Sequence, residues 1–150
     1  MMTGKLITIE GIDGSGKGTQ ATKLIAELNS IGIEAKTYSF PAYEQTFFGK
    51  EIGAFLRGEF GTIDEVHPKL AAILFASDRL EQKERLLKDL EQGIYVVCDR
   101  YVESNMAHQA AKFQENDRID FIEWVKELEY NVNELPKPDI TIFLDVPLCV

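Results

Sequence analysis

The sequence predicts an α/β fold in which a parallel sheet carries helices on both faces. Short runs of β-branched or apolar residues alternate along the chain with stretches of helical periodicity. Because consecutive parallel strands need crossover connections, this alternation predicts right-handed β-α-β units. The 150 residues are enough for one domain that buries a core of its own.

The first third of the chain predicts two strands joined by a helix. Residues 5–10 alternate around β-branched side chains, which is typical of a strand. Residues 17–31 carry apolar side chains at helical spacing, and Gly32 follows as the expected C-terminal stop. Residues 34–40 predict the next strand, and Pro41 ends it because proline cannot donate to a sheet.

Two helices are predicted in the middle of the chain. Apolar side chains from Phe48 to Leu56 mark one face of a short helix. Residues 62–65 match a capping box, so a long helix is expected to begin there, to run to Gln92 and to end at Gly93. The length of this helix predicts a bend or break around residues 78–84.

The last third predicts two buried strands and two helices. Residues 94–98 form a continuous apolar run, as in a strand buried on both faces. Helical patterns follow near residues 104–113 and 118–129, and residues 139–146 predict another buried strand. No repeat or linker interrupts the pattern, so residues 1–150 are expected to form a single domain.

Polar residues or prolines follow three of the predicted strands, at Glu10-Gly11, Phe40-Pro41 and Asp99-Arg100. The carboxyl ends of parallel strands meet at one edge of a sheet, and ligands bind outside that edge. We therefore expect these three strand ends to converge on one crevice.

Charge and composition exclude several classes of partner. The chain has 16 Lys and Arg residues and 25 Asp and Glu residues, which gives a net charge of −9. This charge disfavours nonspecific binding to nucleic acid polymers or anionic membranes. No apolar stretch approaches the ~20 residues that span a bilayer, and the N-terminus does not resemble a signal peptide. Cys98 and Cys149 are expected to be buried, reduced thiols of a cytoplasmic protein.

Residues 11–19, Gly-Ile-Asp-Gly-Ser-Gly-Lys-Gly-Thr, follow a predicted strand and open a predicted helix. Glycines let backbone amides turn inward onto phosphate oxygens, and Lys17 can reach the β- and γ-phosphates of a nucleotide. Gly18 departs from the phosphate-loop pattern, which has Ser or Thr at this position; Thr19 is the neighbouring hydroxyl. The alternative is a glycine-rich turn without a ligand, but nothing in packing explains four glycines and a lysine at a strand end.

Two further groups of residues carry chemistry. Asp99-Arg100-Tyr101 follows a buried strand, where a carboxylate can act on Mg²⁺-bound water and an arginine can clamp a phosphate; the alternative is an ion pair at a helix entry. Phe75 and Arg79 share one face of the long helix and could stack on and hydrogen-bond a planar base. Taken alone, that pair equally fits core packing beside a solvated arginine.

The chain resembles thymidylate kinase, a family of P-loop enzymes that phosphorylate dTMP with ATP, from Lys5 to Val146. The resemblance rests on five motifs in family order, which are Gly11–Gln20, Phe40–Tyr43, Leu74–Arg79, Asp99–Gln109 and Leu135–Asp139. It implies a P-loop NTPase-type parallel sheet and in-line phosphoryl transfer, with no covalent enzyme intermediate.

The resemblance implies a role for each matched position. Lys17, Asp13 and Arg100 are expected to be catalytic. The ATP phosphates are expected to contact Gly11, Ile12, Asp13, Gly14, Ser15, Gly16, Lys17, Gly18 and Thr19. The acceptor nucleotide is expected to contact Asp13, Phe40, Pro41, Tyr43, Phe75, Arg79, Arg100, Ser104, Asn105 and His108. Mg²⁺ carried by ATP is expected to contact Asp13, Thr19 and, through water, Asp99.

Within the acceptor set, the resemblance implies that Phe75 stacks on thymine and that Arg79 donates to its exocyclic oxygen. Arg100 is expected to reach the acceptor phosphate, with Asp99 supporting Arg100 or the metal. The implied partners are ATP and dTMP, and the implied assembly is a homodimer through helices that flank the sheet.

Three departures from the family pattern bear on these expectations. Gly18 lacks the hydroxyl that Ser or Thr at this position would offer to the metal. His108 stands where the family usually has an aromatic residue against the deoxyribose. The family's arginine-rich lid and adenine-holding loop follow the last strand, so a C-terminally truncated domain is expected. The alternatives are a kinase for another nucleoside monophosphate or a deoxynucleoside, and a lidless, non-catalytic nucleotide-binding module.

Overall fold

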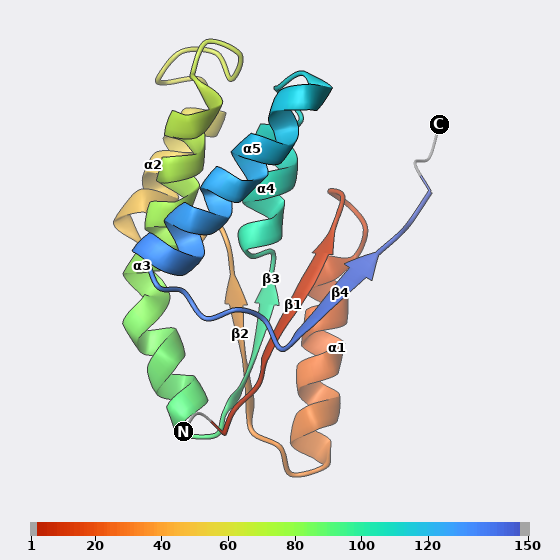
Figure 1. Ribbon diagram of the computed structural model, residues 1–150. Helices are drawn as coiled ribbons and strands as arrows, with labels where there is room; N and C mark the ends of the chain where they lie inside the picture. Colours follow the sequence, from red (N-terminus) through yellow and green to blue (C-terminus); the bar gives the residue numbers. More distant parts are fainter. Residues whose placement is uncertain (1–2, 148–150) are drawn as a thin grey trace. The chain divides into compact units, whose positions relative to one another are not determined.

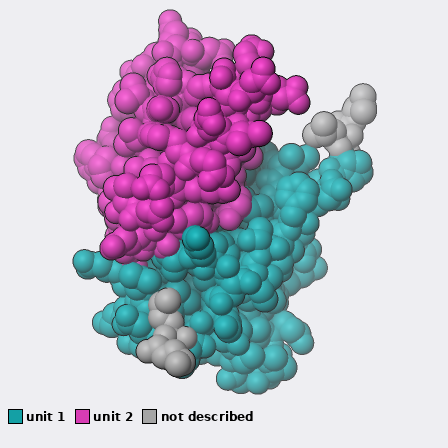
Figure 2. Space-filling model, viewed as in Figure 1, with its two compact units in different colours: residues 1–39, 84–101, 136–150 teal, residues 40–83, 102–135 magenta. Residues whose placement is uncertain are grey.

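The computed structural model describes residues 3–147, which divide into two compact units (Figure 2). The first unit comprises residues 3–39, 84–101 and 136–147, and the second comprises residues 40–83 and 102–135. The sheet belongs to the first unit, whereas the second unit is helical. Each unit holds a different group of the predicted site residues, and each is described separately below.

The first unit is built on four parallel strands, β1 Leu6–Gly11, β2 Ala35–Ser39, β3 Tyr95–Asp99 and β4 Ile140–Leu144 (Figure 1). Their order across the sheet is β2-β3-β1-β4, so β1 lies between β3 and β4. This arrangement confirms the predicted α/β class. Because all four strands are parallel, Gly11 and Asp99 come to the same edge of the sheet.

Helices cover both faces of this sheet. Helix α1, Lys17–Ser30, packs Ala21 against Ile7, Ile9 and Val97 on one face. On the other face, the last turns of α3, Pro68–Glu91, contact β2 through Asp89, which accepts hydrogen bonds at 2.7 Å from both Lys36 Nζ and Tyr38 Oη. Neighbouring side chains of a strand point to opposite faces, so these polar contacts lie away from α1.

The expectation that the last strand is buried was wrong. Strand β4 forms where predicted, but its side chains are largely exposed, with 65% of the Phe143 surface accessible. β4 pairs with β1 and is the edge strand of this sheet. Cys98 is buried in β3 as predicted, and Cys149 lies outside the described residues.

The long central helix differs from expectation at its start and in its middle. Glu65 does reach back to Thr62, accepting from its N–H at 2.7 Å and its hydroxyl at 2.9 Å. These bonds close an isolated turn, however, and α3 begins only at Pro68, a residue suited to the first position of a helix. The expected break around residues 78–84 is also wrong, since α3 is continuous over 24 residues that contain no glycine or further proline.

The other helices of the second unit are α2 Phe47–Leu56, α4 Val102–Ala110 and α5 Glu115–Lys126. Helix α2 begins where Thr46 Oγ1 accepts from the Gly49 N–H at 2.7 Å. Helix α5 passes into a π-helical segment, η1 Glu127–Val132, which side-chain periodicity did not reveal. No helix within residues 3–147 is long and apolar enough to cross a membrane.

Candidate active site

The first unit contains a pocket at the carboxyl edge of its sheet. Its lining consists of eight predicted residues, Asp13, Gly14, Gly16, Lys17, Gly18, Thr19, Asp99 and Arg100. They come from the β1–α1 loop, the first turn of α1 and the end of β3. The structure thus brings the glycine loop and the Asp-Arg pair, which are about eighty residues apart in the chain, to one place.

Glycines shape the loop where other residues would be strained. Gly14 and Gly16 have φ angles of 76° and 91°, in the left-handed region that L side chains avoid. Gly16 directly precedes α1, and no side chain caps this helix. The first backbone N–H groups of α1 therefore border the pocket without a side-chain acceptor, which is the arrangement that binds anions at a helix N-terminus.

Lys17 is held inside the loop. Its side chain extends back so that Nζ donates to Gly11 O at 3.0 Å and to Ile12 O at 2.8 Å, and the residue is only 7% exposed. Burial, and then the positive charge of Arg100, lower the pKa of Lys17, while nearby carboxylates oppose this shift. A bound anion would relieve both effects, because it would supply the countercharge that neutral carbonyl oxygens lack.

Arg100 adopts a conformation that is unusual for a residue with a side chain. Its φ angle is 67°, and its N–H donates to Ile9 O at 3.0 Å. Its guanidinium forms an ion pair with Asp13, whose side chain is 95% exposed. A non-glycine residue in the left-handed region persists only where its surroundings fix it, and such residues cluster at functional sites.

A buried carboxylate anchors the tripeptide that carries Arg100, and sequence reasoning gave it no role. Glu10 accepts from the Tyr101 N–H at 2.7 Å, and Tyr101 Oη donates to Pro136 O at 2.9 Å. Both Glu10 and Tyr101 are buried. The available signal was a glutamate that is the one charged residue of the strand Leu6–Gly11, because a buried carboxylate needs a partner.

The residues around the pocket suit a metal ion whose other ligands are water and phosphate. No group of three or more His, Cys, Asp or Glu side chains within the described chain could hold an ion by itself. Asp13, Thr19 and Asp99 are nevertheless among the lining residues and have side chains that carry oxygen. A Cβ placed on Gly18 would lie 3.4 Å from Asp99 Oδ2. Mg²⁺ commonly keeps water and phosphate ligands and uses one or two carboxylates, so this donor set fits it.

In the second unit, the loop that leads from Phe40 to α2 is tied to α3 by Asp78. This carboxylate is fully buried and accepts from the Ala42 N–H at 3.0 Å and from the Thr46 hydroxyl. Burial raises the pKa of Asp78, and these two hydrogen bonds oppose the shift. Phe40 is buried and Tyr43 is exposed. Asp78 belongs to the predicted motif around Phe75 but had been given no role.

Arg79 is buried rather than solvated. Its guanidinium binds the Glu129 carboxylate through two donors, Nε to Oε1 and Nη2 to Oε2, the latter at 2.9 Å. The Arg79 side chain is 3% exposed and that of Glu129 is fully buried. Phe75, one helical turn before Arg79, packs edge-to-face on Phe55 with 6.5 Å between ring centroids and keeps partial exposure. The alternative of core packing beside a solvated arginine is therefore wrong.

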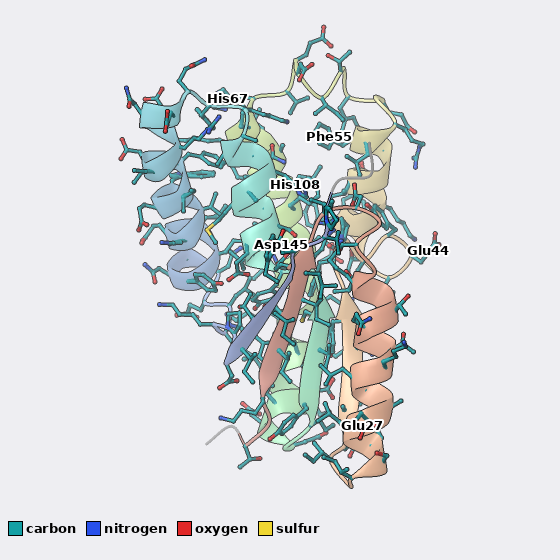
Figure 3. All side chains as sticks on the ribbon, turned by 90° about the vertical axis from the view of Figure 1, so that its right-hand side faces the viewer. Glu27, Glu44, Phe55, His67, His108 and Asp145 are labelled. Carbon is teal, nitrogen blue, oxygen red and sulfur yellow. The ribbon has the colours of Figure 1, made fainter. Side chains whose placement is uncertain are left out.

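Helix α4 carries the remaining predicted acceptor residues. Ser104 and Asn105 are buried, and His108 is exposed on the last turn (Figure 3). Asn105 Nδ2 donates to Ala72 O at 3.0 Å and to Glu129 Oε2 at 3.1 Å, whereas Asn105 Oδ1 has no hydrogen-bond partner within the described residues. Gln109 Oε1, also buried and unpartnered there, was missed by sequence reasoning, although it follows Asn105 by one helical turn.

The chain is similar to known thymidylate kinases along nearly its whole length. The family model for thymidylate kinase matches residues 9–150. The human thymidylate kinase is 35% identical over 145 residues, and that of Mycobacterium tuberculosis is 36% identical over 141 residues. These alignments cover 97% and 94% of this chain but only 62% and 65% of those two proteins.

The fold agrees with a solved structure of the same kind. The thymidylate kinase of Candida albicans superposes with a TM-score of 0.78 at 31% identity, covering 99% of this chain and 65% of that one. Sequence motifs, fold and family match therefore agree, and this chain belongs to the thymidylate kinase family.

Proposed function

We propose that this protein transfers the terminal phosphoryl group of ATP to dTMP and so forms dTDP. The observation that carries the proposal is the pocket in which Lys17, Asp99 and Arg100 border the glycine loop, in a chain of this family. Because the chain spans about two thirds of its relatives' length, the activity is a proposal for the whole protein.

In the proposed reaction, the loop amides and Lys17 hold the ATP phosphates. Lys17 exchanges its carbonyl partners, Gly11 O and Ile12 O, for phosphate oxygens and stabilises the charge that builds up during transfer. Arg100, oriented by Asp13, binds the phosphate of the acceptor. Positioning and electrostatics are sufficient for this chemistry, and no covalent enzyme intermediate forms.

Mg²⁺ would be held by Asp13 and Thr19 and, through water, by Asp99. When bound, the ion neutralises part of the charge on the ATP phosphates. Gly18 supplies no hydroxyl, so we expect the phosphates and water to provide most of the ligands.

The proposed acceptor contacts come from the second unit. Phe75 would stack on the base, Arg79 and Asn105 would face its polar edge, and His108 would lie against the sugar. Phe40, Pro41, Tyr43 and Ser104 would complete this set. We further propose that the protein is a homodimer and acts in the cytoplasm, where ATP and nucleoside monophosphates are available.

The test is a coupled assay of dTDP formation with Lys17→Ala, controlled by Lys23→Ala, an exposed lysine on the same helix. We expect Lys17→Ala to remain folded and to have a kcat lower by about a hundredfold or more, because the substitution removes a cation from the transferring group. The control should behave as wild type. Near-normal activity of Lys17→Ala would refute the phosphate-loop assignment.

Measurements on the wild-type protein separate the proposed function from its alternatives. A non-catalytic nucleotide-binding module would bind ATP in calorimetry and form no diphosphate. A kinase for another acceptor would prefer dUMP, dCMP or AMP to dTMP. This panel of acceptors matters because the thymidylate kinase of Candida albicans is described as having broad substrate specificity.

A further inference from the structure

Glu129 is a buried carboxylate for which the proposed reaction has no use. It lies in the π-helical segment η1, is fully buried, and binds two residues of the expected base site. Oε1 and Oε2 accept from Arg79, and Oε2 also accepts from Asn105 Nδ2. These residues come from three elements, α3, α4 and η1, so one carboxylate fixes both expected base contacts.

The carboxylate decides which way the Asn105 amide points. An ionised carboxylate only accepts hydrogen bonds, and so does the second partner of this amide, the carbonyl oxygen of Ala72. Both partners therefore require the NH₂ group, and an inverted amide would place oxygen against oxygen at two positions. Asn105 Oδ1 must point the other way, where it has no hydrogen-bond partner within residues 3–147.

A second unpartnered acceptor lies one turn further along α4. Gln109 is buried like Asn105, and its Oε1 has no partner among the described residues. Buried acceptors without a donor are costly, so each calls for an explanation. A ligand that brings an N–H group would satisfy such an oxygen.

We infer that Glu129 determines base specificity by holding Asn105 as a hydrogen-bond acceptor. The preferred base must then offer a ring N–H. Thymine and uracil do so at N3, whereas N3 of cytosine is itself an acceptor and would oppose Asn105 Oδ1. Glu129 is thus a positioning residue that favours dTMP and dUMP over dCMP; this inference rests on the proposed function.

The experiment measures kcat/KM, and Kd by calorimetry, for dTMP, dUMP and dCMP in Glu129→Gln. Glutamine has nearly the shape of glutamate but can also donate, so Asn105 becomes free to invert. We expect the dTMP:dCMP ratio to fall by about tenfold, the size of one hydrogen bond between neutral groups. The dTMP:dUMP ratio and the KM for ATP should not change, whereas general loosening would alter all acceptors alike.

Glu103→Gln is the matched control, because this α4 carboxylate accepts instead from Tyr130 Oη, at 3.2 Å. It should keep the wild-type ratio. Glu129→Asp is a second test variant, because it keeps the charge opposite Arg79 but has a side chain that is one methylene shorter. The dTMP:dCMP ratio of Glu129→Asp should lie between those of wild type and Glu129→Gln. Melting curves establish which variants fold.

A folded Glu129→Gln or Glu129→Asp protein with the wild-type dTMP:dCMP ratio would overturn the inference and leave the proposed function standing. Failure of the proposed function would instead appear in the wild-type protein, as no phosphorylation of dTMP or no preference for it over dCMP. That result would overturn both.

Discussion

Replacing Asp78 with alanine should destabilise the protein because it removes the acceptor for two buried donors. The Ala42 N–H, at 3.0 Å, would lose its partner and stay buried. The Thr46 hydroxyl would be less affected, because Ala42 O lies 3.3 Å away as a second acceptor. One orphaned donor at about 1–3 kcal/mol and one weakened bond at about 1 kcal/mol give a loss of about 2–4 kcal/mol.

For a chain of this length, that loss corresponds to a fall in melting temperature of about 4–16 °C. The assay is thermal and urea unfolding, together with the KM for dTMP, which should rise because Asp78 fixes the loop that carries Tyr43. The KM for ATP should stay constant.

Glu81→Ala is the control for this variant. Glu81, also on α3, accepts from the N–H groups of Phe47 at 3.0 Å and Phe48 at 2.9 Å, but it is exposed. Water replaces the lost bonds there, so the cost should stay below about 1 kcal/mol. If Asp78→Ala destabilises no more than Glu81→Ala does, the reasoning from burial is refuted.

Three further predictions concern the site, and a fourth concerns the sheet. Arg100→Ala should lower kcat/KM for dTMP, dUMP, dCMP and AMP in parallel, by about ten- to a hundredfold for a charged phosphate contact. Arg79→Ala should instead change the preference among these acceptors. It should also lower the free energy of unfolding by about 3–5 kcal/mol, because it leaves a buried carboxylate without its countercharge. The same acceptor profile in both variants would contradict the different roles expected for Arg79 and Arg100. His108→Tyr should alter the preference between dTMP and its ribose analogue and leave the KM for ATP unchanged. Equal changes for the two acceptors would mean that His108 is a packing residue. Although burial opposes the shift, hydrogen bonds from Lys36 and Tyr38 lower the pKa of Asp89. Ionised Asp89 therefore stabilises the folded protein at any pH above its unfolded-state pKa of about 4. This stabilisation is lost as the pH falls through the lower pKa of the folded state. Asp89→Asn should flatten that acid limb in urea unfolding at a series of pH values, and an unaltered limb would argue against the role of Asp89.

Sequence reasoning was most successful where structure depends on near neighbours. The alternation of strands and helices predicted the parallel sheet, because side-chain periodicity reflects which face of an element is buried. Gly14, Gly16 and Lys17 predicted a strand-to-helix loop suited to phosphate, since glycine is the residue that tolerates the left-handed backbone found there. Asp99 and Arg100 were recognised because polar residues at the end of a parallel strand reach the common edge.

The same local reasoning misjudged features that depend on what surrounds an element. The apolar run of β4 resembles that of β3, yet within residues 3–147 β4 pairs on one side only and its side chains are exposed. A capping-box pattern at Thr62 closed a turn but did not start α3, because a capping signature is only a local preference. Periodicity also gave no sign that α5 continues into a π-helical segment.

Tertiary structure alone decided how the side chains predicted to contact the base are held. Arg79 and Glu129 are fifty positions apart, and Asn105 joins them only because α3, α4 and η1 pack together in the second unit. Asp78 meets Ala42 across thirty-six positions for the same reason. Residue types and local spacing determine which chemistry a segment can offer, whereas a buried polar group takes its orientation from partners that the folded chain brings to it.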